Sequence, residues 1–225
     1  AMIPQAKNEL KRMADMAQEN LDRSIKGFLN QSDEYLDKIY HREEDINNVS
    51  HAITDYLVKS NQLSLPLADQ KILGSMFYVV NDIERIGDHA ENFADYTKTE
   101  LKHNTGLTGD AKEEIKKMYD AVSKLLKLSL ETFIAQDGVN TQEDKLAEIA
   151  ALEASIDKME RRYQKHHIKR LAKGDCEPRA GLLFSDMLSE LERIADHSVN
   201  IAYSMSDEDE DEMLAAENEA LAANN

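Results

Sequence analysis

The chain has 225 residues, a net charge of −17 and no tryptophan. Its length allows one domain or two small ones, and its acidic balance argues against a nucleic-acid-binding protein, which needs clustered Lys and Arg to neutralise phosphates. No run of about 18 apolar residues occurs, so no segment is predicted to span a membrane. Cys176 is the only cysteine, which excludes an internal disulfide and favours a reducing compartment.

Six long helices are predicted in chain order, because only three prolines and eight glycines interrupt a sequence rich in helix-forming residues. The first three are expected at about residues 4–31, 33–60 and 66–103, and the segment NTGLTGD at 104–110 then breaks the chain. The other three are expected at about residues 111–136, 141–173 and 178–206. Thr141 and Asp144 match a capping pattern at the start of the fifth helix. Because no strand-like alternation appears, the predicted fold class is all-α.

The sequence of the third helix recurs in the sixth. From Glu84 to Ala94, seven of eleven positions are identical to those from Glu192 to Ala202, and the other helices align at similar offsets of 105 to 110 residues. This predicts two tandem, pseudo-symmetric three-helix bundles, residues 1–104 and 105–206. Residues 207–225 contain eight acidic side chains and no Lys or Arg, which is typical of a disordered tail.

A row of polar side chains borders the apolar face of the third helix. On a helical wheel, Glu84, Asp88 and Asn92 lie side by side at four-residue steps, and Gly87 falls inside the apolar arc, where it is predicted to admit a close neighbouring helix. The sixth helix repeats this row with Glu192, Asp196 and Asn200. A solvated helix face, or a row of partners for Arg and Lys, would give the same spacing.

The fifth helix offers a second pair of acids at the same four-residue spacing, Glu153 and Asp157. If it packs beside the sixth helix, four carboxylates face one another, and they need separation, protonation or a cation. An all-oxygen cage of this kind suits a hard or borderline metal ion. In the first half, the corresponding set is one charge weaker: Glu43, Asn47, Glu84 and Asp88.

Other patterns carry less information about function. His89 and His197 are predicted to lie at the surface, away from both the core and the acid row, and the pair Glu100 and His103 is interpreted as chance. No phosphate-binding loop, nucleophile elbow or Cys/His zinc spacing occurs. The basic stretch RRYQKHHIKRLAK at 161–173 is either a solvated helix end or a docking face for a partner or an anionic membrane surface.

The segments NDIERIGDHAEN and SELERIADHSVNIA resemble the repeated motif of the PhoU family, and the resemblance extends from Met2 to about Met205. It implies a regulatory, non-catalytic role in phosphate uptake. The opening AMIPQAKNELKRMADMA is similar to the segment that follows the membrane part of bacterial Na⁺/phosphate cotransporter proteins. We therefore expect a soluble C-terminal domain on the cytoplasmic side of the plasma membrane, partnered by the transporter domain of the same chain, with a homodimer as a further arrangement and no nucleic-acid partner.

The resemblance also implies iron, zinc or other divalent metal ions, held by paired carboxylates. Transferred by position, the metal ligands would be Glu153, Asp157, Glu192, Asp196, Glu43, Glu84 and Asp88, supported by Asn92 and Asn200. Because Asn47 replaces an acid, the second half is predicted to bind metal more tightly. Two alternatives stay open: a free-standing PhoU-type regulator of an ABC phosphate transporter and its sensor kinase, and a carboxylate-bridged metalloenzyme, for which the sequence offers no clear general acid or base.

Overall fold

The computed structural model describes residues 2–137 and 139–206, so the tail predicted for residues 207–225 lies outside the described residues. The described residues form six α-helices and no β-strand, which confirms the predicted all-α class. The helices are α1 (Met2–Leu29), α2 (Leu36–Asn61), α3 (Leu67–His103), α4 (Gly109–Ala135), α5 (Glu143–Lys173) and α6 (Pro178–Tyr203).

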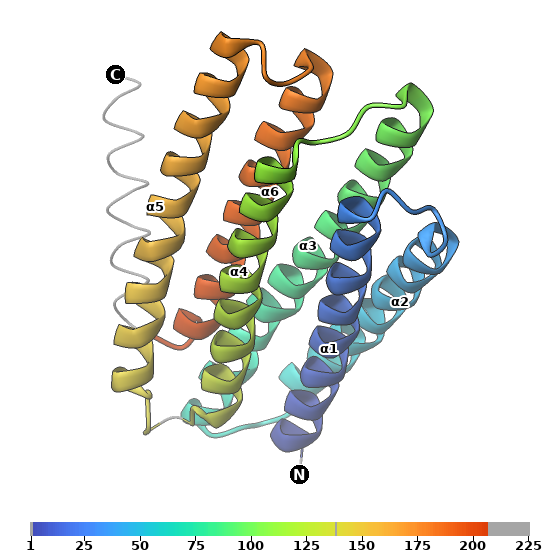
Figure 1. Ribbon diagram of the computed structural model, residues 1–225. Helices are drawn as coiled ribbons and strands as arrows, with labels where there is room; N and C mark the ends of the chain where they lie inside the picture. The colour runs from blue at the N-terminus through green and yellow to red at the C-terminus, as the bar shows by residue number, and fades with distance from the viewer. Residues whose placement is uncertain (1, 138, 207–225) are drawn as a thin grey trace, which may run out of the picture.

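Each set of three consecutive helices packs together, and the two sets then meet through their central helices. Within the first repeat (α1–α3) and the second repeat (α4–α6), every helix contacts the other two. Between the repeats, α3 packs against α6 and α1 against α4. Figure 1 shows the result: α2 and α5 lie at opposite sides of the bundle, with the other four helices between them. Each repeat therefore has one peripheral helix pair, α2–α3 or α5–α6, and we call the contact between the two helices of a pair its groove.

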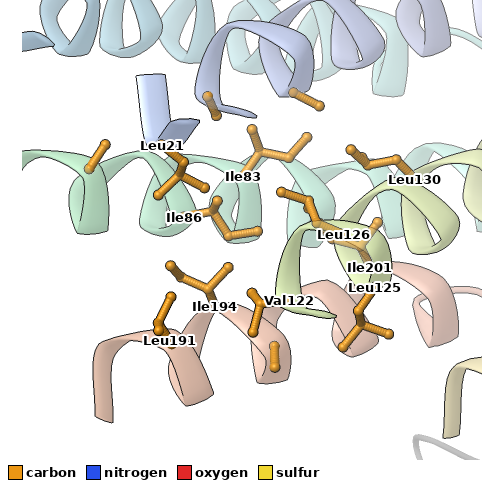
Figure 2. Close-up of a cluster of buried hydrophobic side chains, with 14 of the residues drawn as sticks. Leu21, Ile83, Ile86, Val122, Leu125, Leu126, Leu130, Leu191, Ile194 and Ile201 are labelled. Carbon is orange, nitrogen blue, oxygen red and sulfur yellow. The ribbon is translucent and has the colours of Figure 1, made fainter. Parts of the chain in front are cut away.

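The core is continuous across both repeats. Figure 2 shows side chains from four helices meeting in it, among them Leu21 of α1, Ile86 of α3, Val122 of α4 and Ile194 of α6. All four are at most 2% exposed. Because the apolar residues concentrate on inward-facing stripes, no helix among the described residues has both the length and the apolar character needed to cross a bilayer.

The helix ends follow backbone preferences, with one departure from the predicted capping. Gly174 ends α5 with φ of +70°, a left-handed conformation that favours glycine. At the start of α5, however, the N-cap is Gln142 in a left-handed conformation, and no side-chain capping bond forms. The capping pattern predicted from Thr141 and Asp144 is therefore wrong, because the helix begins at Glu143, later than the pattern required.

Candidate metal centres

The α2–α3 groove contains a buried carboxylate, that of Glu43. Glu43 is only 3% exposed and points from α2 onto α3 at Gly87. A Cβ atom at Gly87 would lie 3.1 Å from Glu43 Oε2 and 3.3 Å from Oε1. The space predicted at Gly87 for a neighbouring helix is thus occupied by the Glu43 carboxylate. The absence of a side chain at Gly87 therefore makes room for this acid as well as for α2.

Glu43 lies among further oxygen ligands from both helices. Single carboxylate oxygens of Glu43, Asp88 and Glu91 all lie within 4.8 Å of one another, a spacing that one metal ion can bridge. Glu84 lies in the same groove, where it accepts a hydrogen bond of 3.1 Å from Ser50. No donor from the described residues reaches either oxygen of Glu43, or the buried Oδ1 of Asn47. We call Glu43, Asn47, Ser50, Glu84, Asp88 and Glu91 the α2–α3 cluster.

The electrostatics of Glu43 reflect this crowding. Burial, together with the neighbouring acids Asp88, Glu91 and Glu84, raises the pKa of Glu43 to about 8. A protonated Glu43 donates a hydrogen bond to Asp88, whereas an ionised Glu43 has no partner among the described residues. The first cluster therefore needs either a proton or a cation at neutral pH.

The α5–α6 groove brings together all four acids predicted for the second half. Burial, together with the neighbouring acids Asp196, Asp157 and Glu192, raises the pKa of Glu153 to about 7. The pKa values of Asp157 and Asp196 are raised for the same reasons, burial first and Glu192 second. The acids of α5 and α6 therefore lie near one another where the two helices pack together.

Two acids of these clusters were missed in the sequence. Glu91 lies three residues after Asp88, and Glu160 lies three residues after Asp157, so each extends its row by one helical turn. Burial raises the pKa of Glu160 to about 7, helped by a hydrogen bond and charge repulsion from Glu192. Both acids follow the preceding aspartate at a three-residue step, whereas the predicted rows use four-residue steps. We call Glu153, Asp157, Glu160, Glu192 and Asp196 the α5–α6 cluster.

The supporting role predicted for Asn92 does not match the structure, whereas that of Asn200 stays a prediction. Asn92 turns away from the α2–α3 cluster and donates hydrogen bonds of 3.2 and 3.1 Å to the two carboxylate oxygens of Glu190 on α6. Asn200 is exposed. A helical wheel predicts both asparagines beside the acids, but it does not show that α3 and α6 also pack against each other. Asn92 hydrogen-bonds across that contact.

The prediction that the two histidines lie at the surface is also wrong. His89 is 7% exposed and hydrogen-bonds to Glu190 of the second repeat. His197 is half-buried, with its Nδ1 atom 3.1 Å from Oδ1 of Asp82 in the first repeat. The two imidazole rings are 6.0 Å apart between centroids. Each Asp–His pair thus directs its acid to its own cluster and its histidine to the other repeat.

Glu190 lies at the centre of this contact between the repeats. It is 6% exposed, and it also accepts a hydrogen bond of 3.3 Å from the hydroxyl of Tyr96. Burial alone would raise the pKa of Glu190, but the hydrogen bonds from His89, Asn92 and Tyr96 outweigh it and hold the pKa below its usual value. Glu190 is therefore an ionised, satisfied structural carboxylate, unlike Glu43.

Both clusters offer oxygen ligands to a metal ion, but among the described residues only the α2–α3 cluster brings single oxygens of three acids within 4.8 Å of one another. The two clusters contain only oxygen ligands from facing helices, and the first holds buried oxygens without a donor, a state that is costly unless a cation or proton compensates it. Such sets suit hard divalent ions and iron, and carboxylate sites between bundle helices are an established arrangement.

Comparison with known proteins adds the family context. The family model described as "PhoU domain" matches residues 10–97 and 115–205. The "Phosphate-specific transport system accessory protein PhoU homolog 1" of Thermotoga maritima is 20% identical over 196 residues, which cover 87% of this chain and 82% of the relative.

Two solved structures share the fold. The crystal structure of PhoU from Pseudomonas aeruginosa matches with a TM-score of 0.80 and 20% identity, over 91% of this chain and 95% of the other. The phosphate transport system regulatory protein PhoU from Streptococcus pneumoniae matches with a TM-score of 0.78 and 21% identity, over 90% and 92%. The similarity in fold therefore extends over both repeats.

Proposed function

We propose that this chain, which belongs to the PhoU domain family, is an accessory protein that regulates phosphate transport and does not itself catalyse a reaction. The observation that carries the proposal is the match of the PhoU domain to both repeats, residues 10–97 and 115–205. The names of the relatives from Thermotoga maritima and Streptococcus pneumoniae support it, since both place those proteins in phosphate transport systems.

The identity of the transporter is a finer hypothesis. The relatives named above support a free-standing regulator of an ABC phosphate transporter and its sensor kinase more than the module of a Na⁺/phosphate cotransporter. The opening segment AMIPQAKNELKRMADMA is the one feature that favours the cotransporter. The two partners can be told apart by co-purification of the tagged chain with each transporter from detergent-solubilised membranes.

Metal ions are the second element of the proposal. The α2–α3 cluster would hold one through Glu43, Asp88 and Glu91, whose oxygens already lie close together, with Glu84 in the same groove. The α5–α6 cluster would hold another through its five carboxylates. A bound cation would neutralise mutually repelling acids and fasten α2 to α3 and α5 to α6, which is a structural and signalling role and needs no open coordination position.

The experiment that tests the regulatory function is complementation. In a bacterium deleted for its own PhoU-type protein, expression of this chain should restore control of phosphate uptake, measured as the rate of labelled phosphate accumulation in cells grown in high phosphate. A His103→Ala variant is a suitable control, since His103 is exposed and outside both clusters. Unchanged uptake despite folded, expressed protein would contradict the proposal.

A further inference from the structure

The segment where α5 ends and α6 begins is basic, although the chain as a whole is acidic. Between residues 161 and 182 there are only two acidic residues, Asp175 and Glu177, in a chain with a net charge of −17. The same segment contains seven basic residues: Arg161, Arg162, Lys165, Lys169, Arg170, Lys173 and Arg179. Arg170 is held by Glu114 at 2.7 Å, but the other six are exposed. They lie along the last turns of α5 and at the start of α6, and the connection between these two helices lies at the upper end of the bundle in Figure 1.

Large apolar side chains are exposed at the same place. Ile168 is 62% exposed, Leu171 is 41% exposed and Leu182 is 64% exposed. Ile168 and Leu171 are three residues apart and share one face of α5. Leu171 reaches the start of α6, where its Cδ2 atom lies 3.4 Å from the position of a Cβ on Gly181, next to Leu182. We call Lys165, Ile168, Lys169, Leu171, Lys173 and Leu182 the α5–α6 tip.

Folding of the three-helix unit does not require this surface. Helices α2 and α5 align at an offset of 110 residues, so Ile168 corresponds to Val58, which is also exposed. At the same offset, Lys165 corresponds to Asp55 and Lys173 to Leu63. Lys169 corresponds to Lys59, and Val58 and Leu63 of the first repeat are exposed as well. The first repeat therefore folds in the same way with fewer basic side chains, and the second repeat differs in its larger number of lysines.

We propose that the α5–α6 tip docks the protein on the anionic surface of a phospholipid bilayer. Lysine side chains can lie along the headgroups with their ammonium groups toward the lipid phosphates, while a few apolar side chains enter the boundary with the acyl chains. Three apolar side chains are too few for a stable protein interface of about 1,200 Å² or more, but they suffice for a bilayer when basic residues add Coulomb attraction.

The charge distribution also determines the orientation. The chain outside residues 161–182 has a net negative charge and is repelled by an anionic membrane, which favours an approach through the hairpin end. The long axis of α5 and α6 then stands away from the membrane, and the α5–α6 cluster begins at Glu160, one to two turns from Lys165. Docking therefore keeps the membrane at the hairpin end, beyond the acids of the α5–α6 cluster.

Vesicle co-sedimentation of the full chain tests this inference. Two vesicle types are compared, phosphatidylcholine alone and phosphatidylcholine with about one third phosphatidylglycerol, at about 0.05 M and about 0.3 M salt. We expect binding to the anionic vesicles at least tenfold above that to the neutral ones, and weaker binding at the higher salt concentration. The double variants Lys165→Glu with Lys169→Glu, and Ile168→Glu with Leu182→Glu, should each lower the bound fraction about tenfold.

Matched controls distinguish the tip from charge in general. Lys124→Glu with Lys127→Glu makes the same charge change on the exposed face of α4, and Leu67→Glu adds an acid to an 81% exposed apolar residue at the other end of the bundle. Both should bind vesicles nearly as well as the parent chain. Circular dichroism and thermal melting confirm that each variant folds.

Three results would overturn the inference: no binding to anionic vesicles, equal binding to neutral vesicles, or an equal loss in the control variants. Binding of soluble polyglutamate at the tip, without vesicle binding, would assign the surface to an acidic protein partner instead. The assay contains neither a transporter nor phosphate, so its outcome is independent of the proposed role in phosphate transport.

Discussion

His89 of the first repeat hydrogen-bonds to Glu190 of the second, and His197 of the second repeat hydrogen-bonds to Asp82 of the first. Each residue of the second pair lies 108 positions from its counterpart: His89 corresponds to His197, and Asp82 to Glu190. Helices α3 and α6 therefore meet as the two subunits of an isologous dimer do, through one self-complementary surface used twice. The duplicated Asp–His motif is explained by this geometry, since its histidine serves the contact and its aspartate the cluster.

Truncation of His89 is predicted to weaken the fold. The His89→Ala variant leaves the buried carboxylate of Glu190 with only Asn92 and Tyr96 as buried partners, and an under-satisfied buried charge costs about 2–3 kcal/mol. Urea unfolding at pH 7 measures the loss. His197→Ala should cost less, about 1 kcal/mol, because that contact is only half-buried. Equal and small losses in both variants, no greater than that of the exposed His103→Ala, would show that the contact contributes nothing.

A pair of glycine substitutions on α3 tests whether the site depends on Gly87. Gly87→Ala places a methyl group 3.1 Å from the Glu43 carboxylate, whereas Gly74→Ala meets no atom within 4 Å. The second change should stabilise α3 by about 0.5–1 kcal/mol through helix propensity. We expect Gly87→Ala to be at least about 1 kcal/mol less stable than Gly74→Ala in urea unfolding, since overpacking offsets the same gain. Equal stability of the two variants would mean that Glu43 moves aside freely.

The sequence predicted more of the fold than of the site, for physical reasons. Helix number and class followed from the scarcity of breakers and from the apolar stripes. The facing acids Glu153 and Glu192 followed from the assumption that α5 packs beside α6. The burial of His89 did not follow, because a helical wheel separates the main core face from the remainder but cannot show which second helix covers that remainder. Only the mutual packing of the repeats, through α3 and α6, determines it.

The pH dependence of stability should be unusual for an acidic protein. The pKa values of Glu43, Glu153 and Glu160 are raised in the folded state to about 8, 7 and 7, above the value of about 4.3 in the unfolded chain. The folded state therefore binds more protons than the unfolded state between pH 5 and 8, so the free energy of unfolding falls as the pH rises through this range. Urea unfolding in the presence of a chelator at several pH values measures the slope.

The variant Glu43→Gln identifies the largest contribution to that slope. An amide cannot ionise, so this variant should lose less stability than the parent chain between pH 5 and 8, with a difference on the order of 1–3 kcal/mol at pH 8. Glu131→Gln, at an exposed position on α4, is the matched control. A free energy of unfolding that rises with pH in the parent chain would contradict the raised pKa values of the clusters.

Metal binding should offset the loss of stability at higher pH, and the affinity for the metal ion should differ between the two repeats. The α5–α6 cluster contains five carboxylates and the α2–α3 cluster four, with the neutral Asn47 at the position equivalent to Asp157. We therefore predict tighter binding of Mn²⁺ at the α5–α6 cluster, because additional anionic oxygen ligands strengthen a hard-cation site. Isothermal titration at pH 7.5 and metal analysis after gel filtration measure affinity and stoichiometry.

Glu192→Ala should remove the tighter site and Glu43→Gln the weaker one, whereas Glu131→Gln should change neither. A chelator should lower the melting temperature of the metal-loaded chain to that of the metal-free chain. Unchanged metal stoichiometry in both cluster variants would exclude the clusters as metal sites. Loss of the tighter site in Glu43→Gln would reverse the predicted order of the two affinities. In that case, burial of the unpaired Glu43 carboxylate would outweigh the number of charges.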